Sequence, residues 1–157
     1  IVAPTVDQLR PMIEDKGLEL KVKSATGVML ADGKRIQQIL INLLSNATKF
    51  SDQGTISLTC RIRGEVVEFR VTDTGIGIPE NELERVFEPF HQVDSTATRR
   101  FGGTGLGLAI SRDIATAHGR SLVATSIIGE GNSVLLTLPL LPATAVAAPQ
   151  TREAAVA

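Results

Sequence analysis

The sequence of 157 residues contains no tryptophan, no tyrosine and a single cysteine, Cys60. The absence of tryptophan and tyrosine, which often stack on bases, and the balance of charge (16 Lys and Arg against 17 Asp and Glu) argue against nucleic acid as a partner. One cysteine cannot form an internal disulfide, which favours a reducing, cytoplasmic compartment for this domain. No apolar run is long enough to cross a membrane, so we expect any membrane anchor to belong to other parts of a longer protein.

The chain begins at Ile1 rather than at a methionine, which also indicates a piece of a longer protein. With 43% hydrophobic residues it can bury one core of ordinary size. From Pro142 onward, alanine, proline and threonine dominate, and such a segment cannot build a core. We therefore predict one domain over residues 1–141 and a flexible tail or linker over residues 142–157.

Hydrophobic periodicity predicts helices that alternate with strand hairpins. Over residues 35–50, apolar residues recur at the three- and four-residue spacing of a half-buried helix. Cys60 falls on the apolar face of the next expected strand, which makes it a core residue. The other expected elements are helices over 5–16, 79–87 and 106–118, and strands over 18–23, 55–63, 65–73, 121–128 and 133–140. This order predicts an α+β two-layer sandwich, a mixed β-sheet covered on one face by helices.

Residues 102–110, Gly-Gly-Thr-Gly-Leu-Gly-Leu-Ala-Ile, place four glycines directly before a helical pattern. Glycine allows positive φ and the close approach of a ligand, and the start of the following helix favours an anion. The dinucleotide fingerprint does not fit, because Leu108 and Ile110 stand where its last glycine belongs, and no lysine completes a Walker pattern. Alone, the run is about as compatible with a plain loop as with a phosphate-binding one.

A polar stripe beside the apolar face of the expected helix 35–50 contains Asn42, Asn46 and Lys49. A polar side is ordinary for an amphipathic helix. Two asparagines one turn apart in mid-helix are less ordinary, because asparagine competes for backbone hydrogen bonds. An amide oxygen on Mg²⁺ is one reason to find them there, and Lys49 would then face the same phosphates.

Asp73 ends the second hairpin strand on the face that carries three apolar residues. A buried carboxylate needs a hydrogen-bond donor, and Gly75 and Gly77 just after it leave room for a ligand. The plainer interpretation is a turn aspartate bonded to its own loop. Asp-Thr-Gly is also the active-site triplet of aspartic proteases, although the Ile-Gly-Ile-Pro that follows lacks their small polar continuation.

Together these segments resemble the sequence boxes of the histidine kinase catalytic and ATP-binding domain, of the GHKL superfamily shared with gyrase, heat-shock chaperone and mismatch-repair ATPases. The resemblance covers about residues 5–141, with the boxes in the family's order and spacing. It implies the Bergerat ATP-binding fold. The boxes are Asp32-x-x-Arg35 with Asn42–Phe50, Asp73–Ile78, Phe87-Glu-Pro-Phe90, residues 102–108, and Gly129-Glu-Gly131 before Leu138-Pro139.

The resemblance implies ATP and Mg²⁺ as cofactors. Asp73 would accept a hydrogen bond from the adenine amino group, Asn46 would bind Mg²⁺, and Asn42 and Lys49 would line the phosphates. Thr137 would touch adenine through water. The other implied nucleotide contacts are Gly75, Gly77, Ile78, Gly103, Thr104, Gly105, Leu106, Gly107 and Leu108.

Residues 91–104 would form a mobile lid over the nucleotide. Arg99 and Arg100 in this lid are candidates to neutralise the γ-phosphate, and we count them as catalytic with Asn42 and Lys49. Two departures from the family, Arg120 and Asn132, are expected to lie away from the main nucleotide contacts.

Asn42 bears on the reaction, because ATPase relatives carry at this position a glutamate that activates water, and an amide cannot take that proton. The resemblance therefore implies a two-component sensor histidine kinase that transfers the γ-phosphate to a histidine. That histidine would belong to a separate dimerisation domain, since neither His91 nor His118 sits in the acceptor motif. We expect the chain to bind ATP without labelling itself.

The sequence of the lid also resembles that of hybrid kinases, which implies a downstream response regulator or receiver domain as a partner. Two other functions stay open. One is a nucleotide-binding sensor or scaffold module without transfer activity, and the other is an ATPase of the same superfamily.

Overall fold

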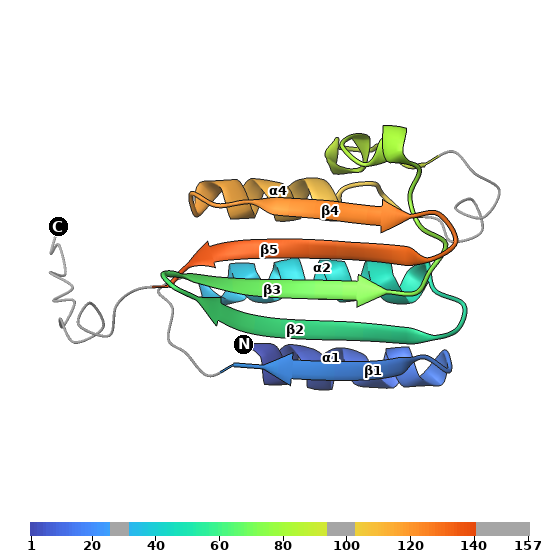
Figure 1. The fold of residues 1–157 in the computed structure, drawn as a ribbon, viewed down its shortest axis with the longest axis horizontal. Coiled ribbons are helices and arrows are strands. Elements are labelled where there is room, and N and C mark those ends of the chain that lie inside the picture. Colours follow the sequence, from blue (N-terminus) through green and yellow to red (C-terminus); the bar gives the residue numbers. More distant parts are fainter. Residues whose placement is uncertain (26–31, 94–102, 141–157) are drawn as a thin grey trace, which may run out of the picture.

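The computed structural model of the chain describes residues 1–25, 32–93 and 103–140 (Figure 1). Within these ranges the backbone forms helices on one layer and strands on the other. The elements are α1 (Val2–Asp15), β1 (Glu19–Ser24), α2 (Gly33–Lys49), β2 (Thr55–Arg63), β3 (Val66–Asp73), the 3₁₀ helices η1 (Glu80–Glu82) and η2 (Arg85–Phe87), α4 (Gly107–Ala117), β4 (Leu122–Ile127) and β5 (Gly131–Pro139).

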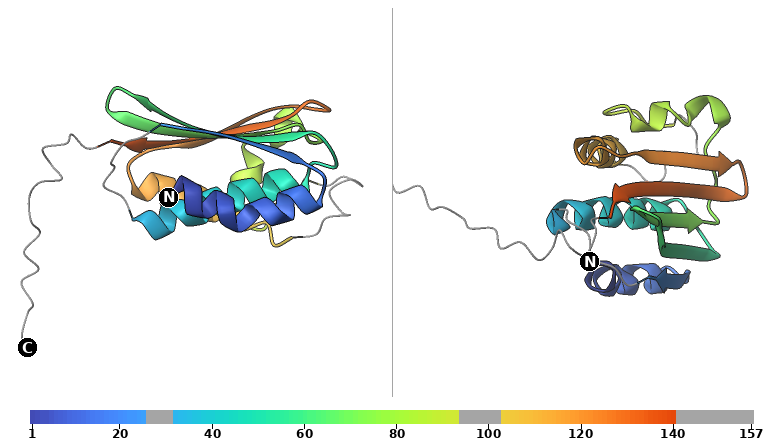
Figure 2. Two further views of the ribbon diagram at one scale, coloured as in Figure 1. Left: turned by 90° about the horizontal axis from the view of Figure 1, so that it is seen from below. Right: turned by 60° about the vertical axis from the view of Figure 1, so that its left-hand side comes forward.

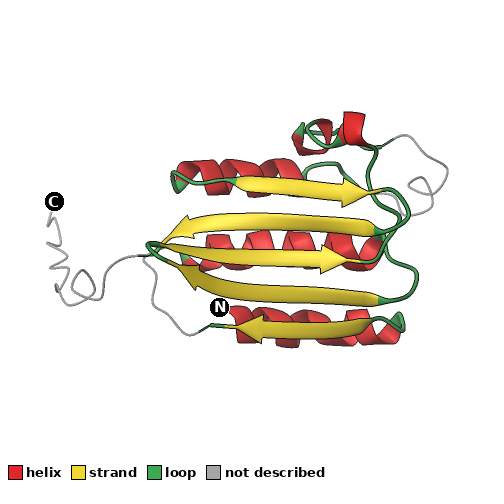
Figure 3. Cartoon of the chain, viewed as in Figure 1, coloured by secondary structure: helices red, strands yellow, loops and turns green. Residues whose placement is uncertain are grey.

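The strands form one sheet in the order β1-β2-β3-β5-β4. β1 runs parallel to β2, and the other neighbouring pairs are antiparallel. Figure 2 shows that α1, α2 and α4 all lie on one face of this sheet, and Figure 3 shows the same two layers coloured by secondary structure. The predicted α+β two-layer sandwich with a mixed sheet covered on one face is confirmed.

The helix α2 crosses the middle of the sheet and is fixed at both ends. At its start the side chain of Asp32 accepts hydrogen bonds from the backbone N–H groups of Lys34 and Arg35, at 3.0 and 3.3 Å. At its end the ammonium of Lys16 donates to the carbonyl oxygens of Thr48 and Lys49, at 2.6 and 3.1 Å. A cation at the C-terminus of a helix also complements the helix dipole.

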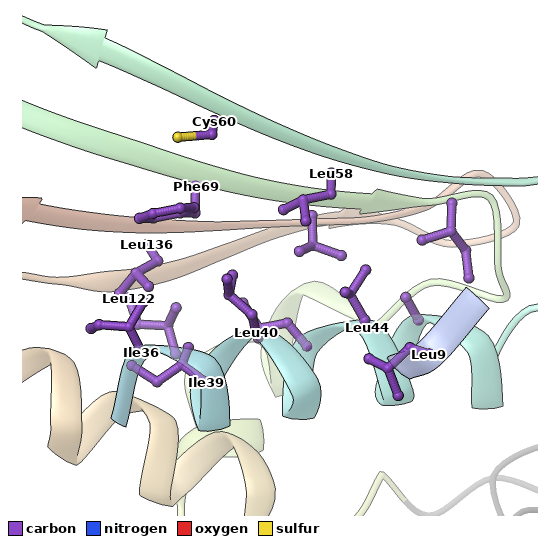
Figure 4. Close-up of a cluster of buried hydrophobic side chains, with 14 of the residues drawn as sticks. Leu9, Ile36, Ile39, Leu40, Leu44, Leu58, Cys60, Phe69, Leu122 and Leu136 are labelled. Carbon is purple, nitrogen blue, oxygen red and sulfur yellow. The ribbon is translucent and has the colours of Figure 1, made fainter. Parts of the chain in front are cut away.

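The core lies between α2 and the sheet. Figure 4 shows Leu40 and Leu44 of α2 pointing toward Leu58 and Phe69 of the strands, with Cys60 among them. Cys60 is 8% exposed, so its predicted place in the core is confirmed. In β2 and β3 the buried residues alternate with partly exposed ones, as expected for a sheet with one covered face.

One expected element has a different form. The helix expected after Pro79 is replaced by η1 and η2, with three residues each. Glu88 ends η2 in an extended conformation (φ −74°, ψ 138°), which is the conformation that the following Pro89 favours. The predicted tail over 142–157 falls outside the described residues. None of the helices in the described ranges is both long and apolar enough to cross a bilayer.

Candidate functional site

A cavity of about 380 Å³ lies at the carboxyl end of β3, against the C-terminal half of α2. Segments far apart in the sequence meet there, because β3, β5 and α2 are neighbours in the fold (Figure 1). The structure brings most of the predicted site residues into one place. Those that line the cavity are Asn46, Lys49, Asp73, Gly77, Ile78, Gly103, Thr104, Gly105, Gly107 and Leu108.

Asp73 is the only carboxylate among the described residues that line this cavity. Its side chain is buried with 6% exposure, and its Oδ1 accepts the backbone N–H of Gly75 at 2.9 Å. Burial raises the pKa of the Asp73 carboxyl above its ordinary value of 3.8, and hydrogen bonds from Gly75 and Asn132 oppose that shift. Asp73 is therefore a buried acceptor that still presents an edge to the cavity.

The observed position of Asn132 differs from the predicted one. Its Nδ2 lies 3.2 and 3.3 Å from the two carboxylate oxygens of Asp73, and its side chain lines the cavity. The expectation that Asn132 lies away from the nucleotide contacts is wrong, because antiparallel pairing of β3 with β5 sets it directly opposite Asp73. Only the register of this long-range pair reveals the contact.

Thr137 is not brought to the cavity. It pairs with Glu68, five positions along β5 from Asn132, which is about 17 Å at the rise of a strand. Its neighbours Leu136 and Leu138 are fully buried toward the helices, so Thr137 points to the opposite face of the sheet. The expectation of a water-mediated adenine contact from Thr137 is wrong.

The hydroxyl of Ser51 is fully buried and has no hydrogen-bond partner within the described structure. A Cβ built on Gly75 would lie 2.9 Å from this hydroxyl, 2.8 Å from Asp73 Oδ1, and closer still to the carbonyl oxygen of Phe50. The backbone at Gly75 therefore passes so close to Ser51 and Asp73 that only glycine fits there. An orphaned buried hydroxyl beside a carboxylate fits a ligand or water that hydrogen-bonds to both.

The segment after Asp73 is held close to the turn between β4 and β5. Gly77 has φ 77°, and a Cβ there would lie 2.5 Å from the carbonyl oxygen of Ile127. The backbone N–H of Ile78 donates to Ser126 Oγ at 2.7 Å. The close approach to Ile127 requires glycine at position 77, and both contacts shape one wall of the cavity.

Asn46 and Lys49 of α2 line the end of the cavity that also contains the glycine segment. The Lys49 ammonium lies 5.2 Å from the centre of the Phe50 ring. Gly103 has φ 127°, and a Cβ on it would overlap the Lys49 Nζ atom. The absence of a side chain at Gly103 is therefore what lets the ammonium lie against this segment.

Asn42 does not line the cavity. Its Nδ2 donates to the carbonyl oxygen of Gly107 at 3.2 Å and to Ser111 Oγ at 3.1 Å, which ties α2 to the first turns of α4. Leu106, which directly precedes α4, also lies outside the lining, and it supplies no side-chain cap for the first N–H groups of α4. Gly75 also lies outside the lining, and its backbone N–H donates to Asp73, which lines the cavity.

The two ends of the segment 91–104 meet beside the cavity. The N–H of Phe90 donates to the carbonyl oxygen of Gly105 at 3.0 Å, and Gln92 Nε2 donates to the carbonyl oxygen of Gly103. His91 lies at the start of the segment, with Nε2 2.5 Å from Glu82 Oε2. Arg99 and Arg100 lie outside the described residues.

Residues 31–142 match the family model described as histidine kinase-, DNA gyrase B-, and HSP90-like ATPase. The chain belongs to this family, and it is an ATP-binding catalytic domain of the histidine kinase type. It is 44% identical over 123 residues to the circadian input-output histidine kinase CikA of Synechococcus elongatus, a match that covers 78% of this chain and 16% of CikA. The chain thus spans about a sixth of that relative's length.

Solved structures of histidine kinases share this fold. Full-length ShkA in complex with AMPPNP superposes with a TM-score of 0.78 and 33% identity, over 90% of this chain and 29% of ShkA. The catalytic domain of the histidine kinase ThkA, in a nucleotide-free form, gives a TM-score of 0.77 and 27% identity, over 90% and 92% of the two chains. The predicted family and fold are confirmed.

Proposed function

We propose that this domain transfers the γ-phosphoryl group of Mg-ATP to a histidine outside the chain, as the catalytic part of a two-component sensor histidine kinase. The residues fit such a nucleotide. Asp73 supplies an acceptor in a buried corner of the cavity that suits a base, and the unpartnered Ser51 hydroxyl lies behind this corner, outside the described lining. Lys49, the glycine segment and the start of α4 supply positive charge and N–H groups that suit phosphates.

Mg²⁺ would be held by the amide oxygen of Asn46 together with phosphate oxygens and water. Among the described residues, no group of three or more His, Cys, Asp or Glu side chains could hold a metal ion. The metal would therefore arrive with the nucleotide, and one protein ligand is sufficient for an ion that keeps much of its water. Bound there, it would neutralise phosphate charge during transfer.

The observation that supports transfer over hydrolysis is the composition of the cavity. Its one carboxylate in the described lining, Asp73, accepts hydrogen bonds from Gly75 and Asn132 in the buried corner, and the α2 residues near Lys49 carry amides and hydroxyls. These residues supply no carboxylate beside Lys49 to take a proton from water, and His91, which also lines the cavity, is paired with Glu82. Phosphoryl transfer to a well-placed acceptor needs mainly positioning and charge neutralisation.

The acceptor histidine would belong to a dimerisation domain of the same protein, and the phosphoryl group would pass to a response regulator or receiver domain. Both histidines of this chain have local partners. His91 pairs with Glu82, and His118 Nδ1 lies 2.8 Å from the carbonyl oxygen of Ile114 at the end of α4. A cytoplasmic location follows from the use of ATP, and any membrane anchor would lie in other parts of the full-length protein.

The test is incubation with radiolabelled γ-phosphate ATP. The chain alone is expected to bind ATP and to remain unlabelled, whereas addition of the dimerisation domain of the longer protein is expected to yield acid-labile phosphohistidine on that domain. If the chain becomes labelled in the absence of the dimerisation domain, the proposal that the acceptor histidine lies on a separate domain is wrong. ATP binding without any phosphohistidine would favour a sensor or scaffold module, and steady hydrolysis at ordinary enzyme rates would favour an ATPase.

A further inference from the structure

The helices α1, α2 and α4 cover one face of the sheet, and no described helix packs against the other, which we call the open face (Figure 2). Side chains alternate between the two faces along each strand, so the residues between the buried ones point to the open face. The charged residues of the five strands on this face are five cations and two carboxylates: Lys21, Lys23, Arg61, Arg63 and Arg70, with Glu19 and Glu68. The open face is therefore positive, although the whole chain has a net charge of −1.

The register of the strands brings most of these cations together. Lys23 of β1 pairs with Thr59 of β2, and Thr59 lies opposite Arg70 of β3. Arg61 is the next residue of β2 on the same face, so it is a diagonal neighbour of Arg70, at a spacing that long side chains bridge. A recess of about 180 Å³ lies here, lined by Thr59, Arg61, Arg63, Glu68 and Arg70.

Only one of the three guanidinium groups that line this recess is paired with an acid among the described residues. Arg63 Nε lies 3.2 Å from Glu68 Oε2. Arg70 Nη1 donates to the uncharged hydroxyl of Ser133 at 3.4 Å, and Arg61 has no ion pair within the described ranges. The recess therefore offers two guanidinium groups to an anion from outside the chain.

An apolar strip on β4 and β5 adjoins these cations on the open face. Leu135 of β5 pairs with Arg70 on one side and with Val123 of β4 on the other. Val123 is 49% exposed, and Ile127 of the same strand is 62% exposed. Arginine beside apolar side chains is a composition typical of the surfaces through which proteins bind one another.

Other anionic partners match the open face less well. None of its residues in the five strands is aromatic, so it lacks the stacking surfaces that single-stranded nucleic acids use. It also lacks the large apolar anchors by which proteins enter a membrane interface. Glu19 and Glu68 among the cations would repel a uniform layer of phosphates, whereas a protein surface can match a mixed pattern residue by residue.

We propose that the open face is a docking surface for an acidic protein partner, with a carboxylate side chain of that partner held between Arg61 and Arg70. Complementary charge brings the partner to this face, and the fork of donors on each guanidinium fixes the carboxylate. The cavity that contains Asp73 lies on the other face, between the sheet and α2. The inference therefore goes beyond the proposed function and does not depend on ATP binding.

The test is an NMR titration of the isotope-labelled chain with an octaglutamate peptide, and with octaglutamine as the uncharged control. Octaglutamate should shift the backbone amide signals around Thr59 and Arg70 in a saturable way, and its affinity should fall as salt is raised. The variant Arg61→Gln with Arg70→Gln should bind octaglutamate about tenfold more weakly, because two exposed ion pairs are lost. Lys34→Gln with Arg120→Gln, which removes the same charge at exposed positions outside the sheet, is the matched control and should bind nearly as wild type does.

The map of shifts on the wild-type chain tests the inference without any variant, and thermal unfolding checks that both double variants are folded. Excess ATP should leave the shifts on β2 and β3 in place. If ATP abolishes them, if they lie only on the helical layer, or if both double variants bind octaglutamate equally well, the open face is not a docking surface.

The class of partner is tested in parallel with vesicles that contain phosphatidylserine and with a short oligothymidylate. Both should bind more weakly than octaglutamate, and octaglutamine should cause no shifts on β2 and β3. If the vesicles or the oligothymidylate bind more tightly than octaglutamate, and lose that affinity in the variant Arg61→Gln with Arg70→Gln, the partner of this face is a membrane or a nucleic acid and the inference of a protein partner is wrong.

Discussion

The backbone N–H of Phe90 donates to the carbonyl oxygen of Gly105 at 3.0 Å, and this bond joins the two ends of the segment 91–104. Both partners have unusual backbone conformations. Phe90 has φ 63° and Gly105 has φ 70°, in the left-handed region that side chains disfavour. Phe90 is also 75% exposed, so its own side chain does little to hold it in place. The position of the segment's ends depends on backbone geometry at Gly105.

Gly105→Ala is expected to separate these ends. A Cβ at this position would lie 2.8 Å from the carbonyl carbon of Phe90 and 2.9 Å from its Cα, and these backbone atoms cannot turn aside as a side chain can. We expect a loss of about 1–3 kcal/mol in the free energy of unfolding and weaker ATP binding. Chemical denaturation and calorimetric titration measure the two effects.

Gly119→Ala is the matched control for this change. Gly119 has nearly the same φ, 71°, but a Cβ there would meet nothing within 4 Å. It should cost only the backbone strain, about 1 kcal/mol, and leave ATP affinity unchanged. If both variants bind ATP as tightly as wild type, the Phe90–Gly105 contact does not organise the site.

Asp73→Asn should have opposite effects on binding and on stability. An amide can turn its NH₂ toward the adenine amino group, so ATP affinity should fall strongly. Without nucleotide, the same change removes a buried charge and should stabilise the domain at neutral pH by on the order of 1 kcal/mol. Calorimetric titration and thermal unfolding of the nucleotide-free protein check the two parts, with the exposed Asp52→Asn as control.

The difference in stability between Asp73→Asn and wild type should also change with pH in a definite direction. The pKa of Asp73 is raised by burial, so the folded protein holds this proton more tightly than the unfolded chain. The corresponding stability is present below the ordinary value of 3.8 and is lost as pH rises through the folded-state pKa. The stability advantage of Asp73→Asn over wild type should therefore grow from about pH 4 to pH 7. An advantage that shrinks over this range would show that Asp73 is not destabilised by its burial.

Much of this site could be read from the sequence because its signals are local. The period of α2 indicates that Asn46 and Lys49 share one side, and alternation along β3 sets Asp73 on the buried face. The glycine segment before α4 is likewise local, since its backbone conformations follow from the residues themselves. Each of these residues lines the cavity or a wall of it.

The misplaced residues depend on long-range register instead. Asn132 reaches Asp73 only because β5 pairs with β3 at one register, and a shift of one residue would turn its side chain to the other face of the sheet. Thr137 is misplaced for the same reason, because that register pairs it with Glu68, five positions along β5 from Asn132. The buried hydroxyl of Ser51 had no periodic pattern to reveal it. Hydrogen bonds between distant strands leave little trace in one sequence.

Asn42→Ala should destabilise the domain even without nucleotide. Its amide is a donor for Gly107 and for Ser111, and the Ser111 side chain is fully buried. Removal of a partner from buried polar groups costs about 1–3 kcal/mol. Chemical denaturation of the nucleotide-free protein measures this cost, and Gln38→Ala, an exposed position one turn earlier on α2, is the control. If Asn42→Ala unfolds as wild type does, its contact with α4 contributes nothing, and a role restricted to the phosphates would explain the residue better.

Asn46→Ala tests whether Asn46 binds Mg²⁺. Asn46 lines the cavity on the same side of α2 as Lys49, and its amide oxygen is the proposed ligand of Mg²⁺. Loss of this ligand should weaken ATP binding about tenfold in the presence of Mg²⁺ and much less in the presence of a chelator, because the metal-free nucleotide does not use it. Parallel calorimetric titrations with and without Mg²⁺ give both affinities. Ser45→Ala, a neighbouring change in the same cavity lining, should alter neither by a comparable factor. An equal loss in both conditions would mean that Asn46 contacts the nucleotide or supports the helix and does not bind the metal.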